Sequence, residues 1–266
     1  MGEILALTWA QWRTNLSYRV RMAYTLVGVV VSVVPLFFVA GAVQPVMADA
    51  IAAEGGQAFG FLLVGLAGVG MLSVAILALP RAIGGGVGSG TLEALMATPA
   101  SLPRLLIGMS AYELAFALAR TLLTLGVGWA LGANLQPSGL FAGVAILVLI
   151  AVVHYPVALI GSALVLAYRT SGPLPQGVML VSTLLGGAYY PTHVIPSWLE
   201  SVSTVVPLTY GLRAMRRVLL EGESLVAVLP DLTALVAFGL ALTVVGVLAM
   251  RWALRYARRN GTLSQY

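Results

Sequence analysis

The sequence contains no cysteine, and all of its 14 basic residues are arginine. Without cysteine the chain can form neither a disulfide nor a thiolate site. The absence of cysteine also gives no information on whether the compartment of the protein is oxidising or reducing. A P-loop needs a lysine on the β- and γ-phosphates of its nucleotide, and Schiff-base chemistry needs a lysine amine. The chain therefore cannot bind and hydrolyse ATP through a P-loop of its own.

Charged residues are also scarce, at 9% of 266 residues, whereas 60% are hydrophobic and the mean hydropathy is +0.98. Soluble domains carry roughly 25% charged residues. The composition therefore predicts a polytopic membrane protein. The net charge of +5 does not indicate a nucleic-acid partner, because the arginines are spread among short loops instead of forming one basic field.

Apolar runs long enough to cross a bilayer recur along the chain, given about 20 residues for each helical crossing. We expect an all-α fold in one domain, 1–266, with six transmembrane helices. The predicted spans are residues 22–43, 59–79, 105–131, 141–166, 174–190 and 232–250. Residues 1–21 are predicted to form an amphipathic helix in the membrane interface. A cleaved signal peptide is the alternative, but the apolar run that follows exceeds the roughly 7–15 residues of the hydrophobic region of a signal peptide.

Arginine is distributed unevenly between the two sets of loops, which predicts the orientation of the chain. If the N-terminus is cytoplasmic, ten arginines fall on inner segments, and only Arg213, Arg216 and Arg217 fall on outer ones. Six crossings place both termini on one side. We therefore expect the N- and C-termini in the cytoplasm.

The segment 184–221 is apolar, yet glycine and proline interrupt it where a spanning helix would continue. Irregular backbone at membrane depth is tolerated only where it is buried in protein or lines a cavity, because lipid offers it no hydrogen-bond partner. We therefore predict a re-entrant hairpin over residues 191–221 that acts as a gate or a pore wall. Trp198 and the pair Tyr189 and Tyr190 are expected at the water boundary. An amphipathic helix should follow, with its arginines away from an apolar side formed by Leu208, Leu212, Met215 and Leu219.

Residues 80–104 form a predicted inner loop, in which glycines at 84–90 precede a potential short helix. A phosphate cradle is one interpretation of the glycines. However, no strand precedes them and no lysine follows, so a tight bend or close helix packing is favoured. Thr91 lies near the start of the short helix, and Pro99 would end it. The helix either docks into a groove of a soluble partner or lies on the membrane surface.

Three polar residues interrupt the predicted spans. Glu113 and Arg120 lie seven residues apart on the third span, on nearly the same face and about 10 Å apart along the axis. Such residues usually face protein or a water-filled cavity. Arg120 is therefore either on the path of a solute or against a neighbouring subunit, or it forms a structural pair with another helix. His154, in the fourth span, is either a proton relay or a structural hydrogen-bonding residue. No metal site is predicted, because His193 is the only other histidine.

Several short motifs occur in an order and spacing that resemble the permeases of the ABC-2 family, the membrane subunits of ABC exporters. In the inner loop they are Gly90-Thr91-Leu92-Glu93 and Ala97-Thr98-Pro99. In the hairpin they are Tyr190-Pro191, Ile195-Pro196-Ser197-Trp198-Leu199 and Val206-Pro207-Leu208-Thr209-Tyr210-Gly211, with Arg213 and Arg216. The likeness covers nearly the whole chain.

The resemblance implies that the inner loop carries a coupling helix that contacts an ATPase, and that the hairpin is an extracellular gate. The ATPase-coupling residues would be Gly90, Thr91, Leu92, Glu93, Met96 and Pro99. The gate residues would be Tyr190, Pro191, Pro196, Trp198, Pro207 and Tyr210. The chain would lie in the inner or plasma membrane of a prokaryote.

We therefore expect a permease without enzyme activity or a cofactor of its own, with ATP and Mg bound by the partner. It would form a homodimer with two ATPase subunits and move an amphipathic, drug-like or lipid-linked solute outward by alternating access, as drug-resistance, lipo-oligosaccharide and polysaccharide export permeases do. The alternative is an ion-coupled secondary transporter that uses Glu113, Arg120 or His154. That class has broken helices in both halves of the chain, whereas this sequence has one only in the second half. A membrane-embedded enzyme would need a clustered catalytic set, which we do not find.

Overall fold

Five long helices make up most of the computed structural model, which describes residues 19–89, 91, 102–168, 170 and 173–259. They are α2 (Arg19–Met47), α3 (Ala58–Gly88), α5 (Leu102–Ala130), α6 (Leu140–Tyr168) and α10 (Leu229–Arg259). The shortest have 29 residues, so they are about 44 Å long, more than the roughly 30 Å of hydrocarbon in a bilayer. All five are long and apolar enough to cross a membrane, and the described residues contain no strand.

Short elements make up the rest of the described fold. They are the helices α7 (Leu174–Leu185), α8 (Ser197–Ser203) and α9 (Pro207–Leu219), and the 3₁₀ turns η1 (Ala52–Glu54), η2 (Pro137–Gly139) and η3 (Thr192–Val194). With 12 residues, α7 is only about 18 Å long and cannot span a bilayer as a helix. Among the described residues the structure thus has five spanning helices where the sequence predicted six, and the predicted span 174–190 is a short helix followed by turns.

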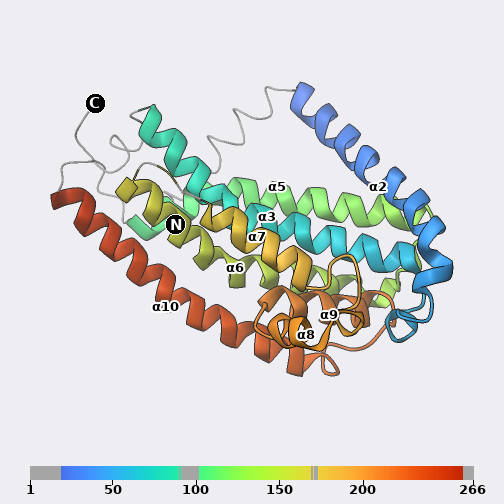
Figure 1. The fold of residues 1–266 in the computed structure, drawn as a ribbon. Helices are drawn as coiled ribbons and strands as arrows, with labels where there is room; N and C mark the ends of the chain where they lie inside the picture. The colour runs from blue at the N-terminus through green and yellow to red at the C-terminus, as the bar shows by residue number, and fades with distance from the viewer. Residues whose placement is uncertain (1–18, 90, 92–101, 169, 171–172, 260–266) are drawn as a thin grey trace.

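The path of the chain explains why the segment after α6 crosses back without a sixth long helix. Helices α6 and α10 lie side by side and run in the same direction (Figure 1). The chain must therefore return from the end of α6 to the start of α10. It does so through α7, which packs against α3 and α6, and through the turns and short helices that follow (Figure 1).

Helix α3 lies at the centre of the bundle. Its most apolar stretch is 72% buried, compared with 17% for α2 and for α10. The larger core cluster includes Phe61 and Leu72 of α3, Ile146 of α6 and Leu208 of α9. A smaller one near the C-terminal end of α3 includes Ile83. The apolar faces of α2 and α10 remain for lipid or another subunit to cover.

Gly84, Gly85, Gly86 and Gly88 are helical, so of the two predicted alternatives, a tight bend or close helix packing, the bend does not occur at these residues. Helix α3 continues to Gly88, nine residues past the predicted end of the span at Leu79. Pro80 is accommodated because Gly161 of α6 leaves room for its ring; a Cβ at Gly161 would lie 3.0 Å from Pro80 Cγ. Residues 1–18 of the predicted interfacial helix and residues 90 and 92–101 of the predicted inner loop lie outside the described residues.

Candidate functional site

The chain between α7 and α10 folds into a compact unit, here called the hairpin segment (residues 186–220), at the end of the bundle where α3 and α10 begin (Figure 1). Helix α7 stops because Gly186 and Gly187 follow it. A Cβ at Gly186 would lie 2.2 Å from the Ser182 carbonyl oxygen, and Gly187 has φ of 75°, a left-handed conformation that favours glycine. The two glycines therefore turn the chain into the hairpin segment.

Two glycines of α3 let the hairpin segment approach that helix. A Cβ at Gly65 would lie 2.0 Å from the carbonyl oxygen of Ala188, and one at Gly68 would lie 2.4 Å from Leu212 Cδ2. Both distances are far shorter than a van der Waals contact. The hairpin segment thus rests on α3 where this helix has no side chains.

Helix α9 has the amphipathic character that the sequence predicted. Its apolar side is completely buried, with exposed fractions of 0–1%, and comprises Leu208, Leu212, Met215 and Leu219. Gly211, on the same helix, faces Ile150 of α6, where a Cβ would lie 2.7 Å from Ile150 Cγ1. Helix α9 is therefore held between α3 and α6 as part of the core.

Arg216 points inward, in contrast to the prediction that the arginines of α9 lie away from its buried side. The residue is 3% exposed, and its Nη2 donates hydrogen bonds to the carbonyl oxygens of Gly187 (2.7 Å) and Ala188 (3.3 Å). Its guanidinium carbon lies 3.4 Å from the centroid of the Phe61 ring, within the range of a cation–π contact. A buried carbonyl without a donor costs free energy, so Arg216 satisfies the turn that ends α7.

Glu54, in η1 between α2 and α3, supplies negative charge to the same place. Burial raises the pKa of the Glu54 carboxyl above its usual value of 4.5, while the positive charges of Arg216 and, less strongly, His193 act in the opposite direction. Glu54 Oε2 is buried and has no hydrogen-bond partner among the described residues. The carboxyl of the loop before α3 thus lies near two basic residues of the hairpin segment, but its burial outweighs their attraction and disfavours its charged form.

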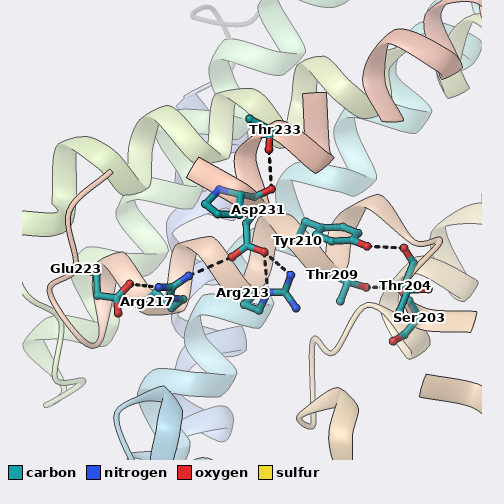
Figure 2. A network of polar contacts seen from close by, with 10 residues as sticks. Ser203, Thr204, Thr209, Tyr210, Arg213, Arg217, Glu223, Asp231 and Thr233 are labelled. Atoms are coloured by element: carbon teal, nitrogen blue, oxygen red, sulfur yellow. Dashed lines mark hydrogen bonds and ion pairs between the residues drawn. The ribbon is translucent and has the colours of Figure 1, made fainter. Parts of the chain in front are cut away.

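Two further arginines connect α9 to the start of α10 (Figure 2). Arg213 Nε donates to Asp231 Oδ1 over 2.8 Å, and Arg217 lies 3.5 Å from Asp231 Oδ2 and 2.7 Å from Glu223. Asp231 is 4% exposed. The sequence analysis did not predict these ion pairs. The pattern that could have indicated them is the single acid Asp231 at the start of the apolar helix α10, which follows closely after the arginine-rich helix α9.

The turn between α8 and α9 is fixed by two side chains of α9 (Figure 2). Thr209 Oγ1 donates to the Ser203 carbonyl oxygen over 2.9 Å, and the Tyr210 hydroxyl donates to the Thr204 carbonyl oxygen over 2.8 Å. The Tyr210 ring also lies 5.8 Å from that of Phe238 on α10. The hairpin segment is thus braced against α10 by both rings and charges.

The predicted gate residues all lie in or beside the hairpin segment, at two places. Tyr190 and Pro191 follow the Gly186–Gly187 turn, and the Tyr190 hydroxyl donates to the Leu184 carbonyl oxygen. Pro196, Trp198, Pro207 and Tyr210 belong to α8, α9 and the residues next to them. Trp198 is 67% exposed and Tyr189 is 45% exposed; their place at the water boundary stays a prediction.

Of the predicted coupling residues, only Thr91 is described. It is exposed, and its hydroxyl lies 2.8 Å from that of Ser89 at the end of α3. Gly90, Leu92, Glu93, Met96 and Pro99 lie outside the described residues. Their assignment stays a prediction.

The three intramembrane polar residues do not come together. Arg120 lines a pocket between α2, α3 and α5 that neither Glu113 nor His154 lines. His154 is 1% exposed within α6, and its Nδ1 lies 2.8 Å from the Ile150 carbonyl oxygen. The part of the chain that the structure describes holds no group of three or more His, Asp or Glu side chains that could bind a metal.

The sequence model of the family described as ABC-2 type transporter matches residues 3–220. This match covers most of the chain, including α2 to α9. The chain belongs to the ABC-2 type transporter family. It is therefore a multi-pass membrane permease of an ABC transporter, and permeases of this family typically work with an ABC ATPase partner. A comparison with curated proteins gave no match.

Proposed function

We propose that this chain is the permease subunit of an ATP-driven exporter, and that it moves an amphipathic, drug-like or lipid-linked solute out of a prokaryotic cytoplasm by alternating access. The observation that carries the proposal is the ABC-2 match over residues 3–220. The absence of lysine from the sequence supports an external source of energy, because no P-loop can form without one. ATP and Mg would be bound by the ATPase, which we propose is present in two copies.

In this proposal the hairpin segment is the extracellular gate. It rests on bare glycines of α3, and ion pairs to Asp231 of α10 hold it in place. Packed contacts and ion pairs of this kind can switch between discrete arrangements when neighbouring helices move. The gate would open when α3 and α10 separate at this end.

The energy would enter at the opposite end of the bundle. The coupling helix after α3, with Leu92 and Glu93, would dock into a groove of the ATPase. Because α3 is one continuous helix from Ala58 to Gly88, a push at its C-terminal end would be transmitted to the hairpin segment at Gly65, about 35 Å away along its axis.

A homodimer is the proposed assembly. The most apolar stretches of α2 and α10 are only 17% buried, so a second copy could cover either helix in place of lipid. We propose that the solute path follows the seam between the two copies.

The experiment that tests the proposal is co-purification and export with the ATPase subunit encoded for this permease. Glu93→Arg should abolish ATPase association and ATP-dependent export. Asp49→Arg, the same charge reversal on an exposed residue of the loop between α2 and α3, should leave both intact. Full association and export in Glu93→Arg would refute the coupling assignment.

The ion-coupled alternative is tested in vesicles that lack an ATPase. It would use Glu113, Arg120 or His154, and of these Arg120 lines a pocket that the other two do not line. Solute accumulation driven by an ion gradient alone would favour this alternative over the proposal.

A further inference from the structure

A polar pocket of about 360 Å³ lies between α2, α3 and α5. Helix α2 diverges from the other two toward its N-terminal end (Figure 1), which opens the space. Six of the eleven lining residues are polar: Tyr24, Thr25, Ser32, Arg120, Thr121 and Thr124. Arg120 is the only charged one.

Arg120 lies deep within its helix and has no protein partner among the described residues. It precedes Ala130, the last residue of α5, by ten positions, or about 15 Å, and follows Arg104 by 16 positions, or about 24 Å. Its guanidinium forms no hydrogen bond or ion pair within the described chain. An unpaired cation at this depth is costly and usually marks a functional site.

Two unused donors face the same point in this pocket. A Cβ placed on Gly70 of α3 would lie 3.9 Å from Arg120 Nη2 and also 3.9 Å from Thr121 Oγ1. The Thr121 hydroxyl, like the guanidinium, forms no hydrogen bond to another described residue. In contrast, the Ser32 and Thr124 hydroxyls donate to carbonyl oxygens of their own helices. The bare surface of α3 at Gly70 therefore leaves room for a group that accepts from both Arg120 and Thr121.

No described acid fills that role. Within the five long helices, the acidic residues are Glu113 and Asp231. Asp231 pairs with Arg213 and Arg217. Glu113 is seven residues from Arg120, about 10 Å along α5, and does not line the pocket. With no acidic side chain in its lining, the pocket has room for a ligand to supply the counter-charge.

We propose that the pocket binds the oxyanion head of an amphipathic molecule, a phosphate or carboxylate, on Arg120 and Thr121. The apolar tail would lie against the exposed valines of α2 outside the pocket, Val27, Val30 and Val31, which are 58%, 48% and 62% exposed. The molecule is either a resident bilayer lipid or the transported solute, because both can present this chemistry. Binding does not depend on the proposed function; only the assignment of the ligand as cargo rests on it.

The test is equilibrium binding of radiolabelled dodecyl phosphate to the purified chain in neutral-lipid nanodiscs. Dodecyltrimethylammonium serves as the cationic probe with the same tail. A charge-assisted hydrogen bond accounts for roughly a tenfold to hundredfold change in affinity, so Arg120→Gln should weaken dodecyl phosphate binding by at least about tenfold. Gly70→Leu, which keeps the arginine but fills the space beside it, should weaken binding similarly.

Arg81→Gln is the matched control, since it removes an exposed arginine of α3 outside the pocket; it should bind like the wild type. Monodisperse elution of each variant establishes that it is folded. Equal binding by wild type and Arg120→Gln, or equal affinity for the two probes, would overturn the proposal. Retained binding of dodecyl phosphate in Gly70→Leu would overturn the placement of the oxyanion head beside α3.

A second measurement assigns the ligand. In proteoliposomes with the ATPase, ATP-dependent movement of dodecyl phosphate that is lost in Arg120→Gln supports the site and identifies the amphipath as cargo. Binding in nanodiscs without movement supports the site as one for bilayer lipid. If no solute of any kind moves with ATP, the proposed function fails, while the binding result stands by itself.

Discussion

Arg216 on α9 donates a hydrogen bond across 2.7 Å to the carbonyl oxygen of Gly187, the residue at which the chain turns after α7. The two residues are 29 positions apart in the sequence. The same nitrogen, Arg216 Nη2, also donates to the carbonyl oxygen of Ala188. One buried cation thus substitutes for the helical hydrogen bonds that are lost where α7 stops. The stability of the hairpin segment should depend on it.

We expect Arg216→Met to lower the apparent Tm of the purified permease markedly. Each buried carbonyl left without its donor costs about 1–3 kcal/mol, and the substitution leaves two. Arg81→Met, at an exposed position of α3, is the control and should change the Tm little. Thermal unfolding in detergent measures both, and equal Tm values for the two variants would show that Arg216 does not support the turn.

Glycine-to-alanine changes along α3 should have opposite effects at two positions. Gly65→Ala places a methyl group 2.0 Å from the Ala188 carbonyl oxygen, and overpacking of this kind costs typically about 1–3 kcal/mol. Gly85→Ala meets no atom within 4 Å and should stabilise the helix by up to about 1 kcal/mol. We expect the apparent Tm to fall in the first variant and to hold or rise in the second. A fall of the same size in both would contradict the close approach at Gly65.

The carboxyl of Glu54 should make stability depend on pH. Because its pKa in the folded protein lies above the ordinary 4.5, the folded state binds the proton more tightly than the unfolded state. Stability due to this group is therefore present in full below pH 4.5 and is lost as the pH rises through the folded-state pKa. Glu54→Gln should thus gain stability over the wild type at pH 7 and lose that advantage on acidification.

The measurement is the difference in apparent Tm between Glu54→Gln and wild type from pH 4 to pH 8. Taking the difference removes the contribution of the groups that titrate in both proteins. Asp49→Gln, at an exposed position of the same loop, provides the control and should show no such trend. A difference for Glu54→Gln that is constant over the whole range would contradict the raised pKa.

Loss of the Asp231 carboxylate should loosen α9 from α10. Asp231 is buried, but the side chains of Arg213 and Arg217 are 51% and 31% exposed, so we discount the pair interaction and expect Asp231→Asn to cost about 1 kcal/mol. Asp49→Asn is the exposed control. Apparent Tm reports the cost, and no difference between the variants would mean that the ion pairs of Figure 2 contribute nothing measurable to stability.

The absence of cysteine offers a direct test of orientation, because a single introduced thiol is the only one in the chain. Trp198→Cys, at a position that is 67% exposed, should react with a membrane-impermeant maleimide in intact cells. Ser89→Cys, an exposed position at the opposite end of α3, should react only after permeabilisation. The reverse pattern would invert the proposed topology.

Much of the helical framework could be predicted from hydropathy. Helices α3, α6 and α10 each begin within three residues of their predicted starts. The ends of α3 and α10 each lie nine residues beyond the predicted ones, because hydropathy marks where apolar residues stop, whereas helical backbone continues through arginines and glycines as long as its hydrogen bonds are satisfied. A change in composition is therefore a poor guide to the end of a helix that extends beyond the bilayer.

The inward position of Arg216 could not be predicted, because its partners are backbone carbonyls, which every residue carries and no sequence pattern reveals. The fifth crossing was misjudged for a related reason. Residues 174–190 are apolar enough to span, but the paired glycines stop the helix at Leu185, and the turn that follows is stable only because α9 supplies a donor from far along the chain. The Arg120 pocket likewise depends on three helices that meet only in the fold.

The shortness of α7 has a consequence for the backbone that follows it. Its 12 residues provide about 18 Å of continuous helix, against roughly 30 Å of hydrocarbon, and the turn beyond it is packed around the Arg216 guanidinium. Because acyl chains cannot donate hydrogen bonds, the carbonyl oxygens of this turn depend on protein donors alone, and lipid cannot replace a donor that is lost.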